Sequence, residues 1–98
     1  TVHSVNLCSS DVSGATLAHL RGLTHLEALY LAKAQITDAK LVQLKGLDEL
    51  RTLRLDGNPI SDAGLVHLKG LANLERLNVY RTKVTAEGVK TLQQALPN

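Results

Sequence analysis

The chain is poor in the side chains on which many cores and reactive sites depend. Its 98 residues include no Phe, Trp or Met, one cysteine (Cys8) and two aromatics, Tyr30 and Tyr80. A single cysteine excludes an intrachain disulfide and a thiolate metal cluster. No apolar run approaches the ~20 residues of a membrane span, and neither glycine-rich phosphate-binding motif occurs. The net charge of +2 is too small to indicate nucleic acid as the partner.

Leucine, isoleucine and valine supply the apolar mass, and they recur with a period of 24 residues. Written in rows of 24 residues, the chain divides into repeats 2–25, 26–49, 50–73 and 74–98, which we take as one domain over 1–98. A column is the set of residues at the same position in every row, numbered from the first residue of the row. Seven columns hold 27 of the 30 aliphatic residues, which chance placement would not produce. These columns contain Val2, Leu26, Leu50, Leu74; Val5, Leu29, Leu53, Leu77; Leu7, Leu31, Leu55, Val79; Val12, Ile36, Ile60, Val84; Leu17, Leu41, Leu65, Val89; Leu20, Leu44, Leu68, Leu92; and Leu23, Leu47, Leu71, Ala95.

Within each row the spacing predicts a strand followed by a short helix. Columns four and six alternate with period two, as in a strand with one buried face, and columns sixteen, nineteen and twenty-two suit one side of a helix. The predicted strands cover residues 4–7, 28–31, 52–55 and 76–79. The predicted helices cover residues 14–21, 38–45, 62–69 and 86–95.

Residues that suit helix ends bound each helical half. A hydroxyl residue in column twelve precedes every predicted helix, as an N-cap does: Ser13, Thr37, Ser61 and Thr85. Asp38 and Asp62 follow directly, where the helix dipole favours a carboxylate. A glycine fit for a left-handed C-cap follows three of the helices: Gly22, Gly46 and Gly70.

One strand per row, connected through a helix, implies parallel strands. No single row can bury its own apolar face, so the rows must stack. We therefore predict an α/β fold, a right-handed solenoid of four strand–helix repeats with the sheet on the concave face and the helices on the convex face. The alternating column-two residues His3, Glu27, Arg51 and Glu75 are expected to pair between rows as a register-setting surface ladder.

Two stretches carry a family resemblance: L-E-A-L-Y-L-A-K-A-Q-I-T-D-A-K-L-V-Q-L over 26–44 and L-R-T-L-R-L-D-G-N-P-I-S-D-A-G-L-V-H-L over 50–68. They resemble leucine-rich repeats of a 24-residue bacterial type, similar to arrays common in planctomycete-like bacteria. The resemblance implies the solenoid; the motif is specific for the fold and says little about function. It also implies a ladder of buried asparagines in column nine, where this chain has only Asn58, with Ser10 and Thr82 as partial substitutes.

The sequence gives little support for a catalytic site or a metal site. Cys8 and His3 could suggest a nucleophile and base, but five residues of extended chain separate them by roughly 16 Å. His19 and His67 share a column two rows apart, about 10 Å at the spacing of strands, which is too far for one metal ion. We predict no enzyme activity, no metal and no cofactor.

The concave strand face is the predicted binding surface. Its variable columns carry both tyrosines and most of the uncommitted cations, and Tyr and Arg are enriched at interaction hot spots. The candidate partner-binding residues are Tyr30, Lys33, Thr52, Arg54, Asp56, Arg76, Asn78, Tyr80 and Arg81. We predict a non-catalytic interaction module whose partner is an acidic protein, although ordinary solvated strand residues would give the same composition.

A second interpretation is a structural or self-association element excised from a larger multidomain protein. The chain starts at Thr1 rather than Met, and its first row has no capping segment. Exposed solenoid ends favour pairing with another copy. Homo-oligomers through these ends are therefore the alternative to a separate protein partner.

Overall fold

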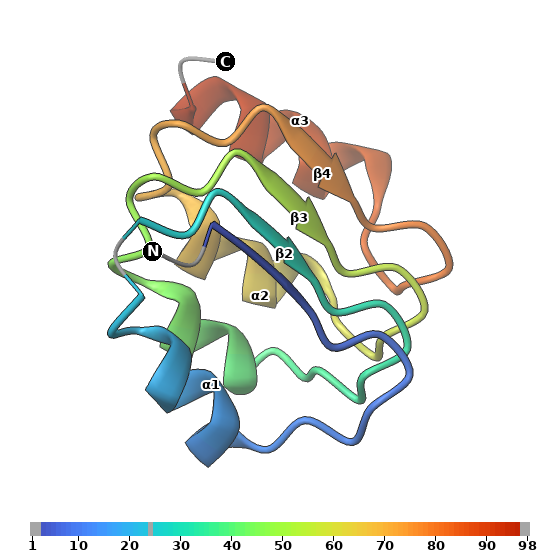
Figure 1. Cartoon of the computed structure of the whole chain (residues 1–98). Helices are drawn as coiled ribbons and strands as arrows, with labels where there is room; N and C mark the ends of the chain where they lie inside the picture. Colours follow the sequence, from blue (N-terminus) through green and yellow to red (C-terminus); the bar gives the residue numbers. More distant parts are fainter. Residues whose placement is uncertain (1–2, 24, 97–98) are drawn as a thin grey trace.

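Four parallel strands form one continuous sheet along a side of the molecule (Figure 1). The computed structural model describes residues 3–23 and 25–96. In sheet order the strands are β1 (Ser4–Asn6), β2 (Ala28–Tyr30), β3 (Thr52–Arg54) and β4 (Arg76–Asn78). Equivalent residues of successive rows pair, as Ser4 does with Ala28 and Ala28 with Thr52. The predicted parallel stacking with a 24-residue register is therefore confirmed.

Each strand is one residue shorter than predicted because the chain turns soon after it. The residue after β1 still donates its N–H to the next row, from Leu7 to the Tyr30 oxygen at 2.8 Å. Two positions further, in column eight, the backbone is left-handed in every row, with φ of 63° at Ser9, 53° at Lys33, 74° at Gly57 and 56° at Arg81. This turn ends the extended segment and directs the chain away from the sheet.

The helical halves of the rows differ more than the sequence suggested. They are α1 (Gly14–Leu20), η1 (Lys40–Leu44), α2 (Asp62–Leu65) with η2 (Val66–Leu68), and α3 (Ala86–Ala95), where η denotes a 3₁₀ helix. The predicted helix 38–45 is a shorter 3₁₀ helix, and the predicted helix 62–69 is confirmed over 62–68, with its second half in the 3₁₀ form. Apolar residues every three positions match the 3.0 residues per turn of a 3₁₀ helix better than the 3.6 of an α-helix.

The predicted helix ends are only partly confirmed. Ser13 and Thr85 act as N-caps, accepting from the N–H groups of Thr16 and Gly88. Ser61 makes no capping bond. Ala39 rather than Thr37 directly precedes η1, although Thr37 Oγ1 accepts from the Lys40 N–H at 3.4 Å. Among the three glycines expected to be left-handed, only one, Gly46, has a positive φ (95°).

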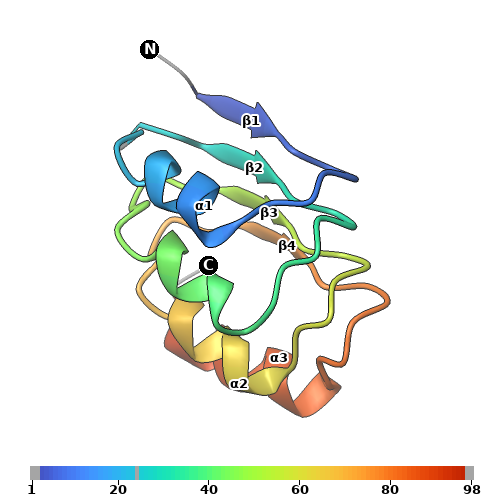
Figure 2. The same ribbon diagram turned by 90° about the horizontal axis from the view of Figure 1, so that it is seen from below.

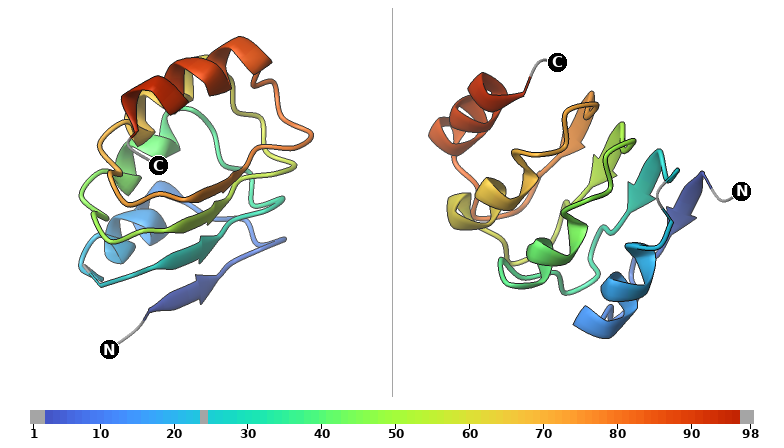
Figure 3. Two further views of the ribbon diagram at one scale, coloured as in Figure 1. Left: turned by 90° about the horizontal axis from the view of Figure 1, so that it is seen from above. Right: turned by 90° about the vertical axis from the view of Figure 1, so that its left-hand side faces the viewer.

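The strands and the helical segments lie on opposite sides of the stack. Figure 2 shows the four strands layered on one side and α1, α2 and α3 on the other. The views in Figure 3 show the same order of rows from β1 to β4, with β1 and α3 at opposite ends of the stack. The sheet therefore presents one whole face that no helix covers.

The predicted core lies between these two layers. None of the described aliphatic side chains in the seven apolar columns is exposed, and those of the middle two rows are the most deeply buried. Ala95, the non-aliphatic member, is exposed. Outside the columns, Val42 and Val66 are 39% and 51% exposed. Val2 lies outside the described residues.

The column-two ladder forms as predicted. Arg51 lies between the carboxylates of Glu75, at 2.9 Å, and Glu27, at 4.0 Å. His3 approaches Glu27 at 3.3 Å and extends the ladder to the first row. These side chains are about half exposed, so each pair contributes a fraction of a kcal/mol.

A second connection between rows was not predicted. The Asp38 carboxylate accepts from the Ser61 N–H at 2.8 Å and from the Ser61 hydroxyl at 2.6 Å. Asp62 accepts from the N–H and hydroxyl of Thr85 with the same geometry, at 2.8 and 2.6 Å. Each aspartate therefore binds the hydroxyl residue that precedes the helical segment of the following row. This contact between rows accounts for the position of the aspartates in addition to their interaction with the helix dipole. This contact is called the aspartate clamp below.

One buried asparagine replaces the expected ladder. Asn58 is 2% exposed, and its Oδ1 accepts from the N–H groups of Ala34 and Ile36 at 2.9 and 3.0 Å. Its Nδ2 donates to the oxygens of Leu31 and Leu55 at 2.8 and 2.9 Å. A single side chain thereby satisfies backbone groups of the two middle rows.

Candidate functional site

The uncovered strand face carries the candidate residues of columns three and five. This sheet face comprises Tyr30, Thr52, Arg54, Arg76 and Asn78. Tyr30 and Thr52 are half-buried, and the other three are exposed. Their backbones belong to paired strands, so the sheet holds the side chains at fixed positions on one surface.

An open hollow of about 390 Å³ adjoins this face where the strands end. It is called the turn hollow here and is lined by Cys8, Ser9, Ala32, Lys33, Arg54, Asp56, Tyr80 and Arg81. Of the nine predicted binding residues, five line this hollow, four from the turns and Arg54 from the end of β3: Lys33, Arg54, Asp56, Tyr80 and Arg81. The remaining four lie on the strands beside it, so the structure divides the predicted surface into two adjoining parts.

A bidentate ion pair forms one wall of the turn hollow. Arg54 Nε and one terminal nitrogen donate to the two carboxylate oxygens of Asp56, at 3.0 and 2.8 Å. This hydrogen bonding lowers the pKa of Asp56 and raises that of Arg54. Asp56 therefore remains ionised, and it compensates much of the charge that Arg54 was expected to offer a partner.

The other cations of the surface are not paired. In the part of the chain that the structure describes, Lys33, Arg76 and Arg81 make no side-chain hydrogen bond or ion pair. The charge of Lys33 does help to lower the pKa of Asp56. The excess positive charge of the surface therefore resides on these three residues rather than on Arg54.

Tyr80 is the most exposed large hydrophobic side chain among the described residues. It is 73% exposed, and its N–H donates to Asn78 Oδ1 at 3.0 Å. The same contact occurs in the first row, where Asn6 Oδ1 accepts from Cys8 N–H at 3.0 Å. Each asparagine orients the turn that follows its strand, so Asn78 positions Tyr80 from the sheet face.

The turn hollow itself could not be read from the sequence. Cys8, Ser9 and Ala32 contribute to its lining although none has a charged or aromatic side chain. A signal was present in their spacing, because columns seven and eight follow every strand. The left-handed turn that makes these positions converge depends on backbone geometry, which the row pattern does not reveal.

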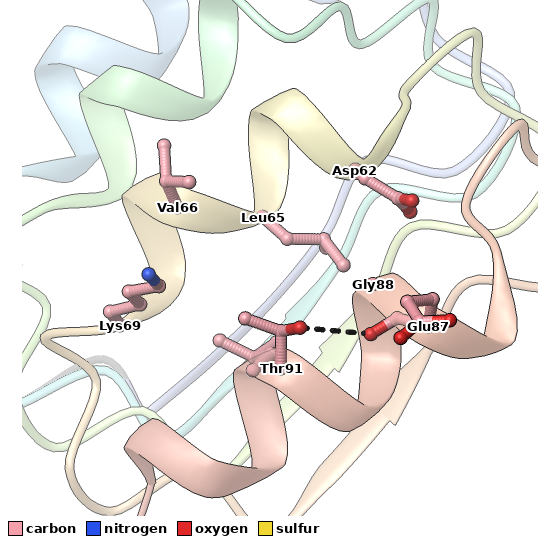
Figure 4. Close-up of a pocket in the computed structure, with 8 residues that line it drawn as sticks. Asp62, Leu65, Val66, Lys69, Glu87, Gly88 and Thr91 are labelled. Carbon is pink, nitrogen blue, oxygen red and sulfur yellow. Dashed lines mark hydrogen bonds between the residues drawn. The ribbon is translucent and has the colours of Figure 1, made fainter.

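A smaller hollow lies on the helical side, between α2–η2 and α3 (Figure 4). Its volume is about 160 Å³. Two of the polar side chains here have structural partners: Asp62 binds Thr85, and the Thr91 hydroxyl donates to the main-chain oxygen of Glu87 at 3.0 Å. Gly88 lies against the Asp62 carboxylate at this hollow, and a Cβ at position 88 would collide with that carboxylate.

The described residues form neither a cluster of metal-binding side chains nor a membrane-spanning helix. No three His, Cys, Asp or Glu side chains gather as a possible metal site within residues 3–23 and 25–96. None of the helices in those ranges has both the length and the hydropathy needed to cross a membrane. The histidines His3 and His25 instead contact the carboxylates of Glu27 and Glu49.

The chain matches a family of known proteins. A family model described as leucine rich repeat matches residues 1–60, which is more than half of the chain. No curated protein matches the sequence. The matched range includes the first two rows and β3, and hence most of the parallel sheet.

Proposed function

Because the chain belongs to the leucine-rich repeat family, we propose that it is a non-catalytic module that binds a protein partner on its sheet face and turn hollow. Leucine-rich repeat domains generally mediate protein–protein interaction, and the family is typically non-catalytic. The parallel sheet alternating with helices is the α/β solenoid of this family. We further propose a single domain over 1–98 and a repeat of the 24-residue bacterial type.

The observation that carries this proposal is the continuity of the exposed surface with a rigid sheet. Tyr30, Arg54 and Asn78 belong to hydrogen-bonded strands, and Asp56 further fixes the Arg54 side chain. Side chains held in this way lose little conformational entropy when a partner binds. Tyr80 supplies an exposed aromatic group next to them, of a kind enriched in binding hot spots.

The charge of the surface favours an acidic partner. Lys33, Arg54, Arg76 and Arg81 oppose one acid, Asp56. Because the Arg54–Asp56 pair is internally compensated, Arg76 and the two turn cations supply the attraction. Exposed charges of this kind chiefly raise the association rate and add specificity.

Photo-crosslinking from position 80 identifies the partner, and binding of the purified partner then tests the surface. We expect Arg76→Glu to weaken binding more than Lys45→Glu or Lys69→Glu, which change the same charge on the helical side. Arg54→Glu should also weaken binding, because it removes a cation and leaves two acids together. Equal effects from the sheet and helical variants would refute the surface.

A second candidate function is end-to-end self-association. It is favoured by backbone N–H groups at the β4 edge of the sheet that lack an acceptor in the described structure. Leu55 N–H donates to Asn78 oxygen, and Gly57 N–H to Tyr80 oxygen. The equivalent donors one row later, on Val79 and Arg81, have no acceptor among the described residues. A second copy stacked in the same register would offer them the carbonyls of its first row.

Side chains at these edges also suit such a stack. Glu75 ends the column-two ladder, and His3 of a second copy would continue its alternation of sign. A hollow of about 190 Å³ at the β4 edge is lined by apolar residues that a further row would cover, among them Leu77, Val79 and Val89.

A designed disulfide tests this register. In a head-to-tail stack Tyr80 of one copy lies in the same column as Cys8 of the next, so Tyr80→Cys should form an intermolecular disulfide. Asp56→Cys is the matched control, since it lies one row further from the edge. A strict monomer across a dilution series, without a disulfide-linked dimer of Tyr80→Cys, would exclude self-association.

A further inference from the structure

Resting on the proposed function, we propose that the turn hollow is the anchor for an acidic, extended segment of the partner, with Lys33 and Arg81 binding successive carboxylates. This assigns the charge recognition to the turns rather than to the strand arginines.

Backbone conformation gives the first reason. Lys33, Gly57 and Arg81 share the left-handed column, with φ of 53°, 74° and 56°. Glycine adopts this conformation without steric cost, whereas other L-residues are disfavoured in it. Long cations therefore occupy positions where glycine would relieve strain, and non-glycine residues in such conformations cluster at binding sites.

The surroundings of Gly57 give the second reason. A Cβ at Gly57 would lie 2.8 Å from Lys33 Cγ, so the Lys33 stem rests against this glycine. Lys33 and Arg81 flank Gly57 from the rows on either side, about 10 Å apart at the usual strand spacing. Both cations line the turn hollow, so a bound segment there would lie within reach of the two side chains.

The occupant follows from charge and shape. Neither Lys33 nor Arg81 has a side-chain hydrogen bond or ion pair in the described structure, while the nearby Arg54 already binds Asp56. In an extended peptide, alternate side chains point the same way and repeat at roughly 7 Å. Flexible Lys and Arg stems can reach two such carboxylates, whereas a single small anion would occupy only part of the hollow.

A labelled peptide of alternating Glu and Ala tests the site by fluorescence anisotropy, with alternating Gln and Ala as the control peptide. Lys33→Gly and Arg81→Gly should each weaken binding about threefold to fivefold, the effect of an exposed charge pair. Both variants should keep or raise the melting temperature, because glycine relieves the left-handed strain. This combination distinguishes a binding role from a structural one.

Two control variants complete the design. Gln35 is also left-handed (φ 57°) but lies outside the hollow, so Gln35→Gly relieves strain without changing binding. Lys45→Gln removes a cation from the helical side and should also leave binding unchanged.

The proposal is overturned if the Glu peptide binds no better than the Gln peptide, or if Lys33→Gly and Arg81→Gly bind it as the unmodified chain does. Displacement of the peptide by inorganic phosphate at matched ionic strength would also overturn it, in favour of an isolated-anion site. If the peptide fails but the crosslinked partner still depends on Arg76, this anchor is wrong and the proposed function stands.

Discussion

The two middle rows and the two outer rows have the same apolar pattern but different environments. In β2 and β3 the central leucines, Leu29 and Leu53, are fully buried. Their counterparts Val5 in β1 and Leu77 in β4 are only partly buried. The apolar side chains of a row are fully buried when another row packs on each side of it. Burial here therefore depends on position in the stack as much as on residue type.

Polar contacts show the same contrast. Asn58 joins the middle rows through four short hydrogen bonds. The equivalent Thr82 in the last row only accepts from Val84 N–H and donates to Val79 oxygen, both within its own row. The aspartate clamp also begins at the second row. Between the first two rows, Lys40 replaces it by donating to the Val12 oxygen at 2.8 Å.

The largest test of this contrast compares the same substitution in a middle and an outer row. Leu53→Ala should lower the free energy of unfolding by about 3–5 kcal/mol, because it leaves a cavity in a site closed on both sides. Leu77→Ala should cost about 1–2 kcal/mol, since its site is already partly open. Urea denaturation measures both, and equal losses would show that stacking neighbours do not set the burial energy.

Removing the buried amide should have the next largest effect. Asn58→Ala leaves two N–H groups and two carbonyls of the middle rows without their partner, and we expect a loss of about 2–4 kcal/mol. Thr82→Ala should cost no more than about 1 kcal/mol. Thermal unfolding of both variants measures the difference, and a Thr82→Ala loss as large as that of Asn58→Ala would contradict it.

A smaller effect is expected where a glycine accommodates the clamp. A Cβ at Gly88 would collide with the Asp62 carboxylate, so Gly88→Ala should cost about 1–2 kcal/mol. Gly14→Ala is the control, because nothing lies within 4 Å of its added Cβ. In an Asp62→Ala background the cost of Gly88→Ala should largely disappear, and additive costs in this double-mutant cycle would reject the clamp.

The smallest expected effect is on the stability of the fold at acidic pH. Hydrogen bonds from Thr85 lower the pKa of Asp62 below its ordinary value of 3.8. The folded state therefore favours the carboxylate, so this contribution to stability is complete above that value and is lost as pH falls through the folded pKa. The stability difference between the unmodified chain and Asp62→Asn should shrink below about pH 3.8. A difference independent of pH would contradict this assignment.

Much of the site could be predicted because strand side chains alternate. Tyr30, Arg54 and Asn78 were placed on the uncovered face from their columns alone, and the structure has them there. The pairing of Arg54 with Asp56 was not predicted, since two residues of one row were treated as independent charges. The clamp was also missed, because Asp38 and Asp62 have a plausible local role at a helix start that conceals their contact with the next row.

Sequence alone determined the period, the parallel register and the identity of the buried side chains. Each of these depends only on the repeat, because equivalent residues of successive rows stack on one another. The tertiary structure decided the helix type, the left-handed turns at Lys33 and Arg81, and the convergence of those turns into one hollow. These features arise from contacts between neighbouring rows, so a residue's position within its own row does not specify them.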